Sequence, residues 1–329
     1  MRPKLDKGRA ETCEACAVGR CVADVAQREA WTAVQAALAR RVCVPRTHGM
    51  VEQYSTSTEG GISSLPSFLL PSEILRDFAA TVLGPLLRRD AEHQMTLAPP
   101  HSLPLLQYVG GVDISFVKDS NLAVACLVVL KYPSMERCHT ILHNCEVTEP
   151  YIPGFLAFRE VPPLVELWNK AQPELRDAAC VPQLLFVDGC GVHHPLRCGL
   201  ASHLGVLLDV PSVGCAKNFL AVDGVTREAM NALFAVELQS DEGAEDKPCI
   251  KPIIGKSGMM WGYAATPNRK VKKPIFISPG HRIGYAEAAA LVLSTCKHRV
   301  PEPIRAADLV SREYIRLMAL NNVKEREAV

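Results

Sequence analysis

Three acidic residues stand where a carboxylate needs a special reason. Asp113 interrupts the apolar run "GGVDISF", Asp188 closes the apolar run "LLFVD", and Glu160 in "FREVPP" opens a predicted helix between them. A half-buried carboxylate in an apolar strand is costly unless a cation or a hydrogen-bond donor compensates for it. Carboxylates at strand ends, with one more at a helix start, can converge on one point and bind hard divalent cations through oxygen.

Each of these residues also has a simpler interpretation. Asp113 could cap a turn, Glu160 could complement a helix dipole, and Asp188 could cap the loop before a helix. Caps outnumber metal sites, so each residue alone favours the simpler interpretation. The three together favour a metal centre that holds Mg²⁺, which is typical of phosphodiester hydrolysis with one metal preparing a water and a second stabilising the leaving oxygen.

Two further features fit that chemistry. His281 in "SPGHRI" lies between a predicted strand and a predicted helix, where an imidazole could move a proton or orient a group. The basic run "NRKVKK", residues 268–273, could contact phosphates. A surface histidine and a solvated loop are the respective alternatives.

Bulk composition limits the class of protein. The chain has 329 residues, 48% of them hydrophobic, and a net charge of +1, which allows a sizeable core and names no partner. We find no apolar run of about 18 to 20 residues and no apolar signal segment at the N-terminus. The thirteen cysteines fit free thiols in a reducing compartment. We therefore expect a protein of the cell interior with no membrane partner, in the cytoplasm, with the nucleus or nucleolus as alternatives.

The N-terminal third is irregular. Residues 1–30 are expected to be a loose extension, and apolar residues at helical spacing in "WTAVQAALARRV" predict a helix over residues 31–42. Residues 43–101 mix Ser, Gly and Pro with short apolar pieces, which indicates an insertion. Residues 31–329 are expected to form a single domain that includes this insertion.

A regular pattern begins at Gln107. Three β-branched runs separated by short turns predict an antiparallel meander over 107–117, 121–132 and 137–147. Helical and apolar strand-like segments then alternate, which predicts a mixed α/β sheet covered by helices on both faces. The predicted helices are 158–171, 198–209 and 284–298, and the predicted strands are 182–188, 211–217, 259–267 and 273–280.

Five ordered motifs resemble those of the endonuclease V family. They are "GGVDISF", "PYIPGFLAFRE", "VDGCGVHH", "VGCAKN" and "SPGHRI", and the resemblance covers roughly residues 107–316. It implies an RNase H-like fold and an inosine-directed nuclease. It also implies that the three carboxylates ligate Mg²⁺, with Mn²⁺ as a substitute.

The resemblance further implies roles for three basic residues. His281 is expected to assist at the scissile phosphate, His194 to contact the substrate backbone, and Lys217 to reach a phosphate. The adjacent His193 is the alternative to His194, and the spacing from Asp188 favours His194.

Base recognition is implied at a second group of residues. Tyr151, held between two prolines in "PYIPG", matches the family's wedge, and an aromatic there can fill the gap left by an extruded base. Gly154, Gly191, Gly214 and Ala216 match pocket positions, where main-chain groups can discriminate the O6 and N1–H of hypoxanthine. A tyrosine packed on the core and a plain loop glycine at 191 are the alternatives.

The expected substrate is single-stranded RNA that contains inosine, cut by a monomer at the second phosphodiester bond 3′ to the inosine. The long N-terminal region and the cysteine richness favour RNA over deoxyinosine DNA, the substrate of a repair nuclease. A module that reads inosine in RNA without cutting it is the other alternative. The presence of all three carboxylates favours the enzyme.

Overall fold

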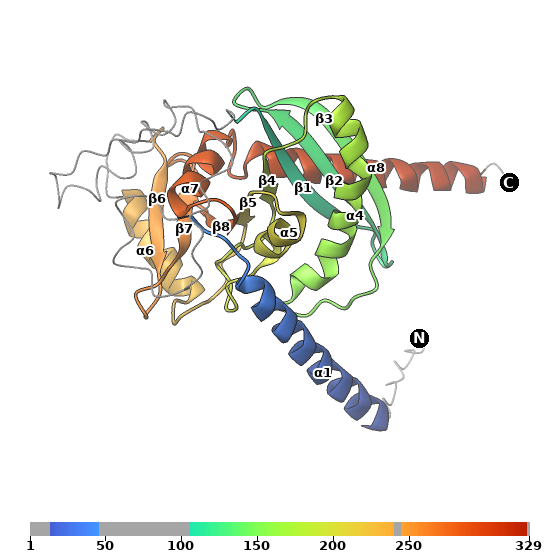
Figure 1. Ribbon diagram of the computed structural model, residues 1–329, viewed down its shortest axis with the longest axis horizontal. Coiled ribbons are helices and arrows are strands. Elements are labelled where there is room, and N and C mark those ends of the chain that lie inside the picture. Colours follow the sequence, from blue (N-terminus) through green and yellow to red (C-terminus); the bar gives the residue numbers. More distant parts are fainter. Residues whose placement is uncertain (1–13, 46–105, 240–244, 328–329) are drawn as a thin grey trace, which may run out of the picture.

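All strands of the part of the chain described here belong to one mixed sheet. The computed structural model describes residues 14–45, 106–239 and 245–327 (Figure 1). The strand order is β3-β2-β1-β4-β5-β8-β7-β6. The strands are β1 (Tyr108–Phe116), β2 (Leu122–Lys131), β3 (Glu136–Glu146), β4 (Leu184–Val187), β5 (Ser212–Ala216), β6 (Cys249–Ile254), β7 (Met260–Thr266) and β8 (Ile275–His281).

The pairing follows the predicted scheme. β1, β2 and β3 form an antiparallel meander, whereas β1, β4 and β5 run parallel to one another. β8, β7 and β6 extend the sheet in antiparallel pairs. The predicted fold class, an RNase H-like mixed sheet flanked by helices, is confirmed.

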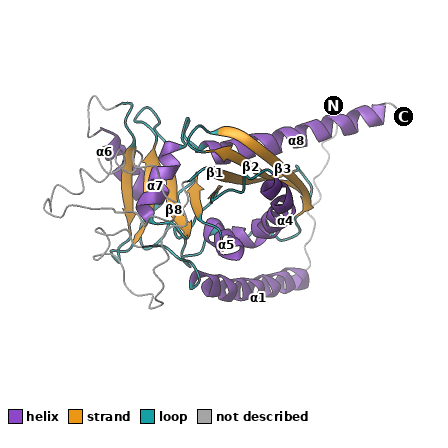
Figure 2. Cartoon of the chain, turned by 45° about the horizontal axis from the view of Figure 1, so that its top comes forward, coloured by secondary structure: helices purple, strands orange, loops and turns teal. Residues whose placement is uncertain are grey.

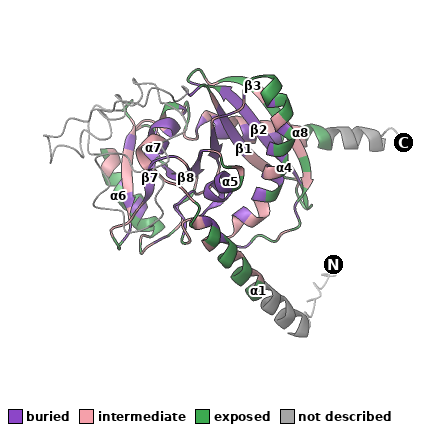
Figure 3. Cartoon of the chain, in the orientation of Figure 1, coloured by how far each residue is buried: buried purple, intermediate pink, exposed green. Residues whose placement is uncertain are grey.

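Helices cover both faces of the sheet (Figures 1 and 2). Leu185 and Val187 of β4 pack against α4 and α5 on one face, while Leu184 and Phe186 pack against α7 and α8 on the other. Because both faces are covered, β4 is buried along its whole length (Figure 3). The helices are α1 (Glu14–Ala39), α4 (Leu156–Asp177), α5 (Leu200–Leu208), α6 (Arg227–Gln239), α7 (Tyr285–Ser294) and α8 (Glu302–Glu327).

The start of α8 crosses β1 at very short range. A Cβ atom on Gly111 would lie 1.9 Å from the backbone oxygen of Pro303. Only glycine leaves room for this approach, and any larger residue would push α8 away from the sheet. The glycine pair before Asp113 therefore helps to set the position of α8 over the end of β1.

The N-terminal prediction needs correction. Residues 14–30 were expected to be loose, yet α1 begins at Glu14 and continues to Ala39. Leu38 near its C-terminal end packs with Cys198 and Val206, so α1 is fixed against the α5 region (Figure 2). Most of the predicted insertion, residues 46–101, and residues 1–13 lie outside the described part of the chain.

Three elements were not predicted. β6 carries Pro252, which disfavours a strand except at a sheet edge, and β6 is the edge strand. α6 buries only Met230 and Phe234 and so shows a weak apolar stripe. α8 starts in a proline-rich stretch and packs the polar Ser311 beside the apolar Ile304 and Ala307. Among the described residues, no helix is long and apolar enough to cross a membrane.

Candidate active site at the end of strands β1 and β4

The strand register brings two of the predicted carboxylates together. The parallel pairing of β1 and β4 ends at Val112 opposite Val187. The next residues along the two strands are Asp113 and Asp188, so they lie at the same level on strands about 4.8 Å apart. Two acidic residues separated by 75 positions in the sequence therefore lie side by side at the carboxyl ends of two central strands.

Glu160 reaches the same place from the first turns of α4. Burial and the negative charges of Asp113 and Asp188 together raise the pKa of Glu160 to about 8. Burial likewise raises the pKa of Asp113 to about 6, together with the charges of Asp308 and Asp188. The carboxylates thus repel one another in a poorly solvated site, the condition in which a bound cation is most favourable.

Asp308 is a fourth carboxylate, which the sequence analysis did not identify. It lies on α8, close enough for its charge to act on Asp113 and Lys217, and Arg312 of the next turn pairs with it at 2.8 Å. The available signal was its place in the apolar stripe that contains Ile304 and Ala307. A charged residue on the buried side of an amphipathic helix needs a partner across the interface.

Ser311, one turn further along α8, holds Asp113 in place. Its hydroxyl donates to Asp113 Oδ2 at 3.1 Å and lies 2.8 Å from the hydroxyl of Ser115. Ser311 and Ser115 are both buried, so the network has little access to water. α8 therefore both adds an acidic group to the site and restrains the carboxylate on β1.

Lys217 follows β5 and occupies the side of the site opposite α4. Its ammonium donates to Asp188 Oδ2 at 2.5 Å. Burial alone would lower the pKa of Lys217, but the hydrogen bond to Asp188 and the nearby acidic charges raise it. Lys217 is thus protonated at neutral pH and lies beside the carboxylates, where a phosphate could also be bound.

The donor set suits a hard divalent cation such as Mg²⁺, because all its acidic members offer oxygen. As the described side chains stand, no three of them are gathered closely enough to hold a metal. Lys217 provides the positive charge at Asp188 in this arrangement. Metal binding would need side-chain rotations and a shift of Lys217 away from Asp188. The repulsion between the carboxylates, which raises the pKa values of Asp113 and Glu160, would favour this change.

The loop after Asp188 is packed against neighbouring backbone. A Cβ atom on Gly191 would lie 2.0 Å from the backbone oxygen of Pro279, and one on Gly214 would lie 2.4 Å from the nitrogen of Gly191. Both glycines are therefore required for close backbone contact, whatever else they do. Ala216, at the end of β5, is buried in the cluster beneath α6.

His194 links the two loops that carry the expected recognition residues. Its Nε2 donates to the backbone oxygen of Gly154 at 2.8 Å, and its Nδ1 accepts from the backbone N–H of Leu196 at 3.2 Å. Burial lowers the pKa of His194, which fits this neutral form. Both ring nitrogens make hydrogen bonds inside the protein, so the structure gives His194 a role in fixing the Gly154 loop, and its contact with the substrate backbone stays a prediction.

His193 and Tyr151, near the two ends of the His194–Gly154 hydrogen bond in the sequence, differ in their exposure to solvent. His193 is fully buried, with Nε2 donating to the backbone oxygen of Leu220 at 2.9 Å, so it cannot contact a nucleic acid. Tyr151 is 67% exposed on the loop before α4, as a wedge residue requires. Gly154 in the same loop has φ +86° with open space around its Cα, so glycine is needed there for its backbone angle.

His281 is not brought to the carboxylates. The pairing through β5 places it level with Leu185, three residues before Asp188 and about 10 Å back along the strands. Its Nδ1 accepts from the backbone N–H of Cys43 at 3.2 Å, and its Nε2 faces Asp209 at 3.4 Å. The expected assistance at the scissile phosphate does not fit this position, and we do not assign His281 to the reaction.

Comparison with known proteins identifies the family of this chain. The family model of endonuclease V matches residues 89–309, about two thirds of the chain. This chain belongs to the endonuclease V family. Mouse endonuclease V is 46% identical over 212 residues, which are 64% of this chain and 60% of the mouse protein. The matched segment thus spans less than two thirds of that relative.

Solved endonuclease V structures share the fold. The catalytic domain of human endonuclease V superposes with a TM-score of 0.66 at 34% identity, over 89% of this chain and 98% of that chain. Endonuclease V of Ciona intestinalis, in complex with a 24mer DNA containing an inosine followed by a ribo-adenosine, has a TM-score of 0.60 at 34% identity. That match covers 65% of this chain and 87% of the Ciona chain.

Proposed function

We propose that this chain is a metal-dependent endonuclease that recognises inosine in single-stranded nucleic acid and hydrolyses a phosphodiester bond on its 3′ side. The observation that carries the proposal is that Asp113 and Asp188 lie at the ends of neighbouring parallel strands, and that burial and the charges of these two residues raise the pKa of Glu160. The inosine-containing complex of the Ciona relative supports the choice of base.

The acidic cluster would hold Mg²⁺, or Mn²⁺ in its place, and the bound metal would supply a polarised water and charge neutralisation at the phosphate. Asp113 is oriented for this by the hydroxyl of Ser311, and Glu160 approaches from the opposite face of the sheet. Lys217 can donate to a phosphate oxygen at the same edge, because its ammonium is protonated and already points into the site.

The base would be recognised beside this cluster. Tyr151 is exposed on a loop that His194 ties to the segment following Asp188. An aromatic wedge on that loop would fill the place of the extruded base, while main-chain groups around Gly191 would meet the O6 and N1–H of hypoxanthine. This arrangement supports a cut close to the inosine, and we propose the second phosphodiester bond on its 3′ side.

We propose RNA as the preferred substrate and a cytoplasmic monomer as the working form, with the nucleus or nucleolus as further locations. Deoxyinosine DNA is the second candidate substrate, since the Ciona complex holds an inosine-containing DNA in which a ribo-adenosine follows the inosine. A reader that binds without cutting is disfavoured, because the acidic residues required for hydrolysis are all present.

The test is Mg²⁺-dependent cleavage of matched single-stranded RNA and DNA oligonucleotides, each with one inosine, beside adenosine controls. The proposal expects cleavage of inosine RNA in preference to inosine DNA and none of the controls. Preferential cutting of DNA would make the chain a deoxyinosine repair enzyme, and equal cutting of the adenosine controls would reject base recognition.

A further inference from the structure

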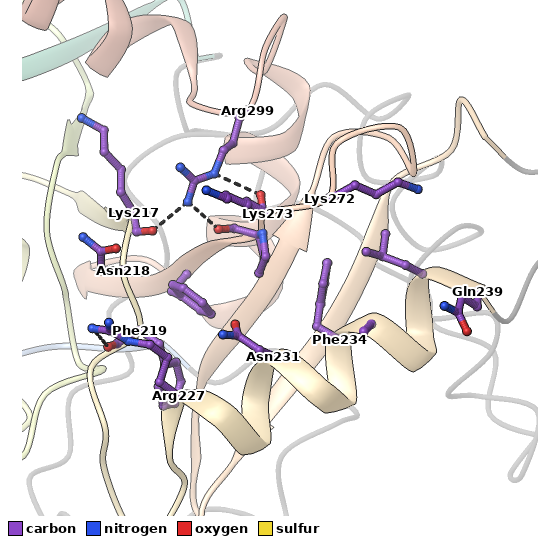
Figure 4. A pocket seen from close by; sticks show the side chains of 14 residues that line it. Lys217, Asn218, Phe219, Arg227, Asn231, Phe234, Gln239, Lys272, Lys273 and Arg299 are labelled. Atoms are coloured by element: carbon purple, nitrogen blue, oxygen red, sulfur yellow. Dashed lines mark hydrogen bonds between the residues drawn. The ribbon is translucent and has the colours of Figure 1, made fainter.

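A groove lined by basic side chains leads away from the active site. It has a volume of about 680 Å³ and lies between α6 and the ends of β5 and β8 (Figure 4). Lys217, the residue hydrogen-bonded to Asp188, forms one end of its lining. The groove therefore begins at a residue whose side chain contacts the acidic cluster.

The charged side chains that line the groove are all positive. Five of its fourteen residues are Lys or Arg and none is Asp or Glu, in a chain whose net charge is only +1. The basic members are Lys217, Arg227, Lys272, Lys273 and Arg299. A concave surface with one sign of charge attracts and concentrates ligands of the opposite sign.

Arg299 gives the groove a fixed shape. Its guanidinium donates to the backbone oxygens of Lys217 at 2.7 Å, Pro274 at 2.9 Å and Lys273 at 3.0 Å (Figure 4). It thus ties the segment after β5 to the segment before β8. Lys273 itself is exposed and makes no side-chain hydrogen bond or ion pair within the described residues, so its ammonium is available to a ligand.

The aromatic and amide side chains of the groove indicate which part of a nucleic acid it would contact. Phe219 and Phe234 line the groove but are buried in the cluster beneath it, so they do not offer open ring faces for base stacking. Asn218 and Asn231 are exposed and carry amide donors and acceptors, which suit phosphate oxygens and ribose hydroxyls. The chemistry favours contact with a sugar–phosphate backbone without selection of bases.

We infer that this groove binds the sugar–phosphate backbone of the single strand that flanks the cleavage site. The inference rests on the proposed function, since Lys217 contacts Asp188 and also lines the groove, so that a strand held at the acidic cluster can enter the groove beside it. Binding in the groove adds affinity that does not depend on the base, so longer substrates bind more tightly than short ones. Lys272 and Lys273 form the end of the basic run, and the groove explains their position.

The experiment measures binding of an unmodified single-stranded RNA of about 20 nucleotides, by fluorescence anisotropy at salt concentrations of about 50 to 200 mM. The test variant is Lys272→Ala with Lys273→Ala. The matched control, Lys131→Ala with Arg137→Ala, removes the same charge from exposed positions at the opposite edge of the sheet. Because this RNA lacks inosine, the result does not depend on inosine-directed cleavage.

We expect the test variant to bind roughly tenfold more weakly at low salt and the slope of log K against log salt to fall by about 1.4, or 0.7 for each lost phosphate contact. The control should match the wild type. A second variant, Asn231→Asp, places a negative charge on the α6 wall and should weaken binding as well. Equal binding by both double variants, or no RNA binding by the wild type, would overturn the inference.

Discussion

The raised pKa of Glu160 is the residue-level sign of how the site works. Burial and two neighbouring carboxylates raise the pKa of this group to about 8, from an ordinary value of 4.5. Asp113 behaves in the same way, with a pKa near 6. Without a cation, the folded chain must keep these groups protonated or accept their repulsion.

This predicts how metal-free stability depends on pH. Between about pH 4 and pH 8 the folded state binds more protons than the unfolded state at these positions, so the free energy of unfolding falls as pH rises. In the presence of a chelator, Tm should fall from pH 5 to pH 8. The variant Glu160→Gln should flatten this decrease and give a Tm higher by a few degrees at pH 8.

Differential scanning calorimetry with Asp177→Asn as the control checks this, because Asp177 is an exposed acidic residue of the same helix. A wild-type Tm that rises toward pH 8, with Glu160→Gln no different from the control, would show that the carboxylates do not repel one another.

Tyr151 carries the second residue-level prediction. Its ring is exposed and packs on no core residue, so Tyr151→Ala should leave Tm unchanged. Binding of inosine-containing RNA should weaken by about 1 to 3 kcal/mol, the range for one base stacked on an aromatic ring. Tyr151→Phe should bind like the wild type. Unchanged affinity of the alanine variant for inosine RNA would remove the wedge from the account.

For His281, the sequence motif and the structure predict different effects of a substitution. The motif implied a role at the scissile phosphate, while the structure places the imidazole among Cys43 and Asp209, at the other end of the strands. We expect His281→Gln to retain the wild-type kcat, measured at saturating Mg²⁺ and substrate. A large loss of kcat in a variant with wild-type Tm would restore the catalytic assignment.

The sequence was informative about residues that break a local pattern. Asp113 and Asp188 interrupt apolar runs, and such interruptions can be read without a structure. Asp308 was missed because α8 itself was not predicted, although its place in the apolar stripe of Ile304 and Ala307 was a signal in the sequence. His194 fits a motif, but its hydrogen bond to Gly154 joins it to a loop 40 residues earlier in the chain.

At the scale of elements, α8 is the part that completes the site. It crosses β1 at Gly111 and presents Asp308 and Ser311 to Asp113. A helix held this closely can position a carboxylate through a single hydroxyl. Residues that orient metal ligands typically contribute tenfold to a hundredfold to metal affinity.

Ser311→Ala should therefore raise the Mg²⁺ concentration needed for half-maximal cleavage by about tenfold, with little change in kcat at saturating Mg²⁺. Ser311→Thr, which keeps the hydroxyl, should restore much of the affinity. Asp308→Asn should shift the same Mg²⁺ titration in the same direction. A Mg²⁺ dependence unchanged in both Ser311→Ala and Asp308→Asn would mean that α8 serves packing alone.

Elements with strong apolar periodicity were predicted well. The meander and β4 have β-branched apolar runs, and α7 has an unbroken run of alanine and leucine. α6 and β6 were missed because their contacts with the core are few or interrupted by proline. The early start of α1 has no explanation in its weak apolar pattern, and its packing against α5 is a tertiary contact.

At the scale of the whole molecule, the features of the candidate site come from several elements around the middle of the sheet. Tyr151 lies on the loop before α4, the carboxylates lie at the ends of β1 and β4, and the basic groove begins beyond β5 at Lys217. The strand order places the carboxylates of β1 and β4 next to β5, where the groove begins. The net charge does not reveal this, because the 36 basic and 35 acidic residues of the whole chain balance to +1 wherever they lie.

The measurement that tests the central claim most directly is the single-turnover cleavage rate of an inosine-containing RNA by the variant Asp188→Asn in Mg²⁺. The substitution keeps the shape of the side chain and removes the charge that lies beside Asp113. The account predicts a rate lower by more than about a hundredfold, with wild-type Tm and substantial RNA binding. Cleavage at the wild-type rate would show that the acidic edge of β1 and β4 is not the hydrolytic centre.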